Sequence, residues 1–165
     1  MTKERRHPNV VNQDEVEANE RKQGKHHMMM RRLGPVAGNA QLGATVTEVP
    51  PGAISFPFHY HCANEESIYV IAGTGTARIG DARVKVRPGD WIAYPTGPAH
   101  AHQMINDGAT PLVYLCISTM HTCEVAGYPD SNKIGVLAGA SFDKPWLRTL
   151  TRGDSLDYWD GEPNA

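Results

Sequence analysis

The segment FHYHCANEESIYVIAG, residues 58–73, decides both the fold and the chemistry expected of this chain. Two histidines, His59 and His61, stand at positions i and i+2, so on a β-strand their imidazoles point to the same face. Glu66 opens the following run and alternates with the apolar Ile68, which puts its carboxylate on the face that buries apolar side chains. A buried carboxylate is costly unless a positive group meets it. A metal ion held by the two histidines is such a group.

Glu65 is the rival carboxylate. Its spacing from His61 also suits a ligand, but strand alternation points it outward. Imidazole nitrogen together with carboxylate oxygen suits Zn, Fe, Mn, Ni or Co and disfavours Ca and Mg. Two simpler interpretations of the His-x-His pair stay open at this point: surface histidines beside a solvated glutamate, or hydrogen-bonded histidines in a core.

Two further histidines follow Gly97, at positions 100 and 102. Residues 100, 102 and 104 share one face if a strand begins that early. Either His100 or His102 can then reach the first cluster when a barrel closes, and either can supply a fourth ligand.

Short apolar runs alternate with turn residues from residue 42 to residue 118. At least seven short strands are predicted, which indicates an all-β fold, either a closed barrel or a sandwich. Gly80-Asp81 predicts one tight hairpin. Asp107-Gly108 predicts a second hairpin, between strands at 101–105 and 112–117.

The bulk composition excludes several classes of protein. A chain of 165 residues is long enough for one domain with a sizeable core. Its net charge of -2 creates no field that would attract nucleic acid or an anionic membrane. No stretch of about 20 apolar residues is present to span a membrane, and the N-terminus lacks the apolar core of a signal peptide, so a cytoplasmic protein is expected. An odd number of cysteines without a C-x-x-C pair argues against a disulfide framework: Cys62, Cys116 and Cys123.

Three regions are expected along the chain. Residues 1–40 are polar and basic, and we expect an arm that packs on the barrel or on a second subunit, because no groove-reading motif accompanies the charge. Residues 41–120 form the barrel core. Residues 121–165 form a loop-rich C-terminal extension that packs on the barrel through aromatic anchors: Tyr128, Trp146, Tyr158 and Trp159.

The histidine clusters resemble the two sequence motifs of the cupin superfamily. The first motif, G-x5-H-x-H-x(3,4)-E-x6-G, is matched, with one extra residue after the first glycine, by Gly52, His59, His61, Glu66 and Gly73. The second motif, G-x5-P-x-G-x2-H-x3-N, is matched in its first half by Gly89, Pro95 and Gly97. The resemblance implies a single double-stranded β-helix (jelly-roll) barrel and one divalent metal ion, held by three histidines and one carboxylate.

The second motif leaves two candidates for its histidine. Counting forward from Gly97 gives His100, and counting back from Asn106 gives His102. Residues 101–106 are similar to a group of small bacterial cupins in which A-H-x3-N follows a lengthened glycine turn, so the resemblance favours His102 as the metal ligand. His100 is then expected to be a general base at the barrel mouth, since imidazoles titrate near neutral pH. The simpler alternative for His100 is a surface histidine.

The resemblance implies a small-molecule ligand or substrate but no particular reaction. We expect a metal-dependent enzyme that acts on a small polar organic molecule, as an oxygenase or an isomerase/lyase. The alternative is a non-enzymatic small-ligand-binding or sensor cupin. A metal-free sugar-modifying cupin is disfavoured by the complete set of ligands. Cupins are commonly dimers, and the N-terminal arm and a strand at 42–49 are expected to cover a partner's sheet edge in a homodimer.

Overall fold

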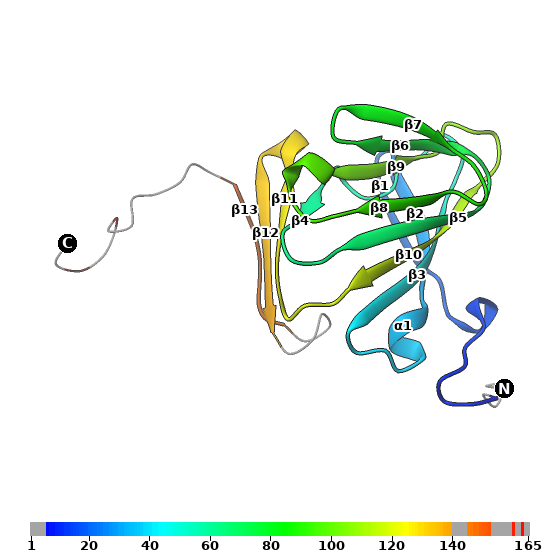
Figure 1. The fold of residues 1–165 in the computed structure, drawn as a ribbon, viewed down its shortest axis with the longest axis horizontal. Helices are drawn as coiled ribbons and strands as arrows, with labels where there is room; N and C mark the ends of the chain where they lie inside the picture. The colour runs from blue at the N-terminus through cyan, green and yellow to red at the C-terminus, as the bar shows by residue number, and fades with distance from the viewer. Residues whose placement is uncertain (1–5, 140–144, 153–159, 161–162, 164–165) are drawn as a thin grey trace.

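The fold is built almost wholly from antiparallel strands (Figure 1). The computed structural model describes residues 6–139, 145–152, 160 and 163. The strands are β1 (Asn19–Gln23), β2 (His26–Arg32), β3 (Leu42–Val49), β4 (Tyr60–His61), β5 (Glu66–Ala72), β6 (Gly75–Ile79), β7 (Ala82–Val86), β8 (Trp91–Tyr94), β9 (His102–Ile105), β10 (Leu112–Thr119), β11 (Cys123–Tyr128), β12 (Lys133–Gly139) and β13 (Pro145–Arg152). The helical pieces are short: η1 (Gln13–Glu15), α1 (Leu33–Val36), η2 (Pro98–His100) and η3 (Pro129–Ser131). None of these helices is long and apolar enough to cross a membrane, as far as the chain is described.

Two sheets enclose the core of the barrel. The larger has six strands in the order β1-β2-β3-β10-β5-β8, and the smaller has three in the order β7-β6-β9. Strand alternation sends every second side chain inward, and the inward residues of both sheets form one apolar cluster, which includes Met30, Val49, Ile68, Val70, Ala77, Met104, Leu112 and Tyr114. The all-β barrel predicted from the sequence is confirmed.

Backbone bridges close the barrel at the end that carries the histidines. His59 lies just before β4 and forms an antiparallel bridge with His102, the first residue of β9. The His102 amide donates to the His59 carbonyl at 2.7 Å, and the His59 amide donates to the His102 carbonyl at 3.2 Å. The first and second histidine clusters are therefore held side by side by the main chain itself.

One of the two predicted hairpins is correct. β6 and β7 pair around Gly80, whose φ of 52° is the left-handed conformation that such a turn requires. The second is wrong, because β9 pairs with β6 whereas β10 pairs with β3 and β5. The buried Asn106 amide donates to the carbonyls of Val49 and Thr110, so this turn carries the chain from one sheet to the other.

The basic N-terminal region, expected as an arm that packs on the barrel or on a second subunit, packs on the barrel as two strands. β1 and β2 extend the six-stranded sheet beyond β3, and Met28 and Met30 of β2 are buried in the core. β3 is paired on both sides, with β2 and with β10, and has no free edge. Residues 42–49 are therefore not available to cover a partner's sheet edge, as was expected for a dimer.

The region after residue 120 contains three strands where a loop-rich extension was predicted. β11, β12 and β13 form a sheet that is joined to the barrel by pairing of β11 with β4, and β13 is its outer edge (Figure 1). Of the expected aromatic anchors, Tyr128 stacks on His59, whereas Trp146 is 82% exposed. Tyr158 and Trp159 lie outside the described residues.

Candidate metal centre

Four side chains converge at the mouth of the barrel where the bridge closes it. They are His59, His61 of β4, Glu66 at the start of β5, and His102 at the start of β9. One ligand atom from each lies within 4.8 Å of every other. Glu66 points inward together with Ile68 and Val70, whereas Glu65 is exposed, as alternation predicts.

Main-chain carbonyls fix the orientation of two of the imidazoles. Nδ1 of His59 lies 2.8 Å from the carbonyl oxygen of Pro57, and Nδ1 of His102 lies 3.0 Å from that of His100. Because a carbonyl only accepts hydrogen bonds, Nδ1 carries the hydrogen in both rings. Nε2 therefore keeps a free lone pair, which is the state in which a histidine binds a metal.

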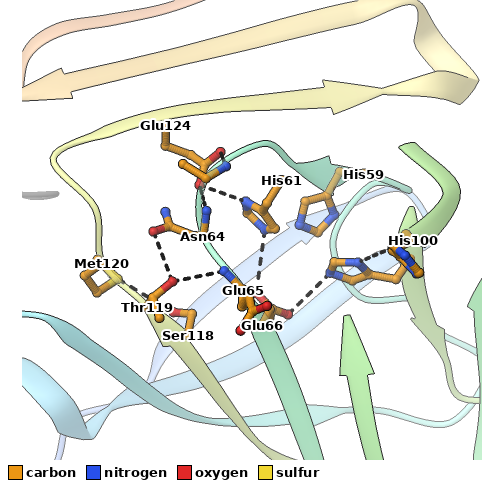
Figure 2. Close-up of polar contacts among 12 residues, drawn as sticks. His59, His61, Asn64, Glu65, Glu66, His100, Ser118, Thr119, Met120 and Glu124 are labelled. Carbon is orange, nitrogen blue, oxygen red and sulfur yellow. Dashed lines mark hydrogen bonds and ion pairs between the residues drawn. The ribbon is translucent and has the colours of Figure 1, made fainter. Parts of the chain in front are cut away.

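Glu124 of β11 holds the third imidazole from behind (Figure 2). One of its carboxylate oxygens lies 3.7 Å from Nδ1 of His61, whose Nε2 lies 3.7 Å from Glu66 on the opposite side. Glu124 is buried, and its two oxygens also accept hydrogen bonds from the amides of Cys62, Ala63 and Asn64. One carboxylate thus fixes the backbone that leads from β4 to β5 and lies in close contact with the His61 ring.

The buried nitrogens of the cluster lack hydrogen-bond partners. Among the described residues, both ring nitrogens of His61 and Nε2 of His102 are buried without one; the carboxylates at 3.4–3.7 Å are close contacts but not hydrogen bonds. An unpartnered buried polar atom is costly, and native proteins rarely leave one without a reason. Three imidazole nitrogens and one carboxylate oxygen are the donors that Zn, Fe, Mn, Ni and Co bind in proteins. The residues present therefore fit such an ion.

The charge state of the cluster also suits a cation. Burial, reinforced by the neighbouring imidazoles of His102 and His61, lowers the pKa of His59 to about 4. Burial likewise lowers the pKa of His61. For Glu66, burial alone would raise the pKa, but the contact with His102 and the other two imidazoles lower the pKa to about 2. At neutral pH an ionised carboxylate thus faces the neutral imidazoles of His59 and His61, which suits the binding of a positive ion.

The packing around the cluster holds its parts in place. The ring of Tyr94 stacks on that of His102 at 3.8 Å with planes 8° apart. Burial and the neighbouring Glu66 raise the pKa of the Cys116 thiol, which stays protonated at neutral pH.

The cavity beneath the cluster has a volume of only about 20 Å³. A larger hollow of about 500 Å³, beside Lys85 and Asp107, contains none of the four residues.

The remaining histidine of the second cluster takes a different position. His100 belongs to η2 and is half-buried, and the strand begins only at His102, so the two do not share a strand face. Its carbonyl orients His102, while its ring is outside the four-residue cluster. Glu124 was missed from the sequence because it lies far along the chain from His61 and no local spacing connects the two.

Comparison with known proteins identifies the fold family. Residues 45–118 match the family model described as Cupin domain. This segment is a cupin domain. A protein of Methanocaldococcus jannaschii, itself uncharacterized, is 34% identical over 70 residues, which cover 42% of this chain and 54% of that protein, so the match spans about half the length of the curated relative.

Two crystal structures resemble this chain over most of its length. One is named a sugar phosphate isomerase from a cupin superfamily and comes from Silicibacter pomeroyi; it is 24% identical, covers 94% of this chain and 96% of its own, and has a TM-score of 0.76. The other, from Acidithiobacillus ferrooxidans, carries the same activity name provisionally; it is also 24% identical, covers 87% of this chain and 92% of its own, and has a TM-score of 0.77. At this identity the likeness shows the fold alone.

Proposed function

We propose that this cupin is a divalent-metal-dependent enzyme that acts on a small polar organic molecule. The observation that carries the proposal is the convergence of four ligand atoms within 4.8 Å, with buried imidazole nitrogens that have no partner among the described residues. His59, His61, Glu66 and His102 would hold one ion of Zn, Fe, Mn, Ni or Co. When bound, such an ion polarises a carbonyl or hydroxyl group of the substrate, and iron also activates oxygen.

The residues of the chain supply orientation and proton transfer. The Pro57 and His100 carbonyls hold two imidazoles in the metal-binding tautomer, and Glu124 holds the third. His100, which belongs to η2 two residues before His102 and lies outside the ligand set, is the proposed general base. Isomerase/lyase chemistry is the reaction class to test first, because both solved structures with wide coverage are named as sugar phosphate isomerases; oxygenase chemistry is the second.

Metal analysis tests the proposal directly. Purified protein is stripped with a chelator, dialysed against each of the five metals in turn, and its metal content is measured. We expect one ion per chain and a higher melting temperature, since an ion present at a hundredfold excess over its Kd stabilises the native state by about 2.7 kcal/mol. Turnover of hydroxy-aldehydes and hydroxy-acids is then compared with and without oxygen. A protein that binds none of the five metals contradicts the proposal.

We also propose a homodimer that forms through the outer face of the six-stranded sheet. Tyr69 of β5 is paired with Trp91 of β8, and these two and Ile71 are 43%, 58% and 44% exposed. A large exposed apolar patch favours association with another protein surface. Light scattering of the wild type and of Trp91→Arg tests it: the wild type should have twice the chain mass and the variant a lower mass, and a monomeric wild type contradicts it.

A further inference from the structure

The register of the sheet joined to the barrel places a row of cationic side chains on the same face as a metal-ligand candidate. Ala126 is directly paired with His61 on one side and with Gly135 on the other, and Gly135 is paired with Leu150. Directly paired residues share a face, and alternate residues along each strand lie on it as well. The face shared with His61 therefore carries Glu124, Tyr128, Lys133, Leu137, Arg148 and Arg152.

Aromatic contacts connect one of these cations to the candidate metal centre. The ring of Tyr128 stacks on that of His59, with centroids 5.9 Å apart and planes 23° apart. The Lys133 ammonium lies over the same tyrosine ring, 5.4 Å from its centroid. Added together, these two distances set an upper limit of about 11 Å between the ammonium and the centre of the His59 imidazole. A small organic molecule can span such a gap.

A second cation stands directly opposite the first. Lys133 is paired with Arg152 across β12 and β13, and like charges in directly opposed positions destabilise a sheet. In the described part of the chain, no carboxylate forms an ion pair with either residue. The acidic residue on this face, Glu124, already accepts three amide hydrogen bonds and contacts His61. An anion bound between Lys133 and Arg152 would relieve their repulsion.

The size of the internal cavity decides on which side of the cluster a ligand must lie. The internal space lined by His59, Glu66 and His102, about 20 Å³, holds about one water molecule and no organic compound. A ligand that reaches the metal therefore approaches from the mouth, on the side where β11 and β12 lie beside β4 (Figure 1). β4 contains His61, and Tyr128 of β11 stacks on His59.

We propose that Lys133, assisted by Arg152, binds the anionic end of a ligand whose other end reaches the metal centre. The ligand class is a small hydroxylated carbon chain with a terminal phosphate or carboxylate. Both groups offer the oxygen acceptors that an ammonium or a guanidinium binds with charge-assisted hydrogen bonds. This inference rests on the proposed function and deepens it, because it specifies the substrate class for that site.

Three 2-hydroxy acids test the inference by calorimetry on the Zn²⁺-loaded protein. Glycerate, malate and 3-phosphoglycerate share the 2-hydroxy-carboxylate end and differ at carbon 3, which bears a hydroxyl, a carboxylate or a phosphate. We expect malate or 3-phosphoglycerate, or both, to bind about tenfold more tightly than glycerate. A tenfold gain in affinity corresponds to the free energy of about one charge-assisted hydrogen bond. Which of the two gains more distinguishes a phosphate from a carboxylate as the natural end group.

Variants identify the source of that gain. Lys133→Met should reduce this gain in affinity over glycerate to less than about threefold. Arg152→Met should have a smaller effect. The metal content of each variant is measured to check that it has folded. Lys22→Met, on the exposed β1, makes the same charge change on another sheet and should retain the full gain. An unchanged gain in Lys133→Met overturns the inference, as does an equal loss in Lys22→Met.

Failure of the metal site can be told apart from failure of the anion site. If the protein binds no metal, the proposed function fails, and inorganic phosphate is then titrated into the metal-free protein. Weak phosphate binding that is lost in Lys133→Met and kept in Lys22→Met supports the anion site independently. Absence of Lys133-dependent binding overturns it.

Discussion

The carboxylate of Glu124 lies 3.7 Å from Nδ1 of His61, because the paired strands β11 and β4 bring together two residues that are far apart in the sequence. Glu124 belongs to β11, outside the residues that match the cupin family model. A carboxylate behind a metal-binding histidine fixes the ring and makes it a better donor. The strands after the cupin domain therefore contribute a residue to the surroundings of the candidate metal centre.

Glu124→Gln should weaken metal binding. The amide keeps the shape of the side chain but removes the charge behind His61, and loss of such a partner typically costs about 10–100-fold in metal affinity. Competition with a chromophoric chelator measures the change. Glu65→Gln, at an exposed neighbouring position, is the matched control and should leave the affinity unchanged. A variant that is less stable but binds the metal as tightly as the wild type would show that Glu124 only supports the fold.

Substitution of the two neighbouring histidines should separate their roles. His102→Gln removes a ligand while keeping most of the volume stacked on Tyr94, so metal affinity should fall by more than the loss of about 100-fold expected for a supporting residue. His100→Ala should retain the metal and lose turnover. Metal content and activity are measured on the same samples. If His100→Ala loses the metal instead, the fourth ligand has been assigned to the wrong histidine.

The metal-free protein should lose stability as the pH falls from about 6.5 to 4. An unfolded histidine has a pKa near 6.5, whereas His59 in the fold has a pKa of about 4. In this window the unfolded chain binds a proton that the native chain does not, so stability increases with pH, by at most about 1.4 kcal/mol per pH unit for one such group. Glu66 adds stability that is present above pH 4.5 and is lost as the pH falls through 2.

Urea unfolding at several pH values measures this dependence. His59→Gln should have a shallower slope than the wild type between pH 4 and 6.5, because the variant lacks the group that takes up the proton on unfolding. Equal slopes in the two proteins would show that His59 is not held neutral by its surroundings.

Two glycines with positive φ should differ sharply in their tolerance of a side chain. Gly73, with φ of 76°, closes the first cupin motif, and a Cβ there would collide with the backbone carbonyl of Pro111. Gly89 has φ of 94°, but a Cβ there meets open space. Gly89→Ala should cost about 1 kcal/mol of unfolding free energy from backbone strain, and Gly73→Ala more than about 3 kcal/mol. Chemical denaturation measures both, and similar losses would contradict the proposed clash.

Local patterns predicted an all-β fold and three members of the four-residue cluster, and the resemblance to cupins added the barrel and favoured His102 as the fourth. Alternation alone separates Glu66 from Glu65 and puts His59 and His61 on one face, because both follow from the two-residue period of a strand. His102 needed the downstream Asn106 as a reference point. That asparagine is buried, and its amide donates to the Val49 carbonyl and so fixes the turn after β9. Because the position of Asn106 in the fold is fixed, counting back from it locates the histidine.

Non-local pairing accounts for what the sequence did not reveal. All five residues of β1 are exposed, so this edge strand has no apolar period, and its charges suggested an unstructured arm. β13 is exposed along nearly its whole length, and β12 is only partly buried. Neither strand therefore has the apolar alternation that would predict it from the sequence. The contact between Glu124 and His61 depends on the pairing of β11 with the two-residue strand β4, which no local spacing encodes.

That pairing makes the short connection between β10 and β11 intolerant of insertions and deletions. Residues 120–122 are all that lies between the two strands, and a shift of β11 by one position relative to β4 would turn Glu124 to the opposite face and bring Cys123 or Val125 behind His61. A loop on the surface is normally free to change its length over evolution. Here the length of the connection determines which residue of β11 lies behind His61. Relatives that keep a carboxylate at the position of Glu124 should therefore also keep a connection of the same length.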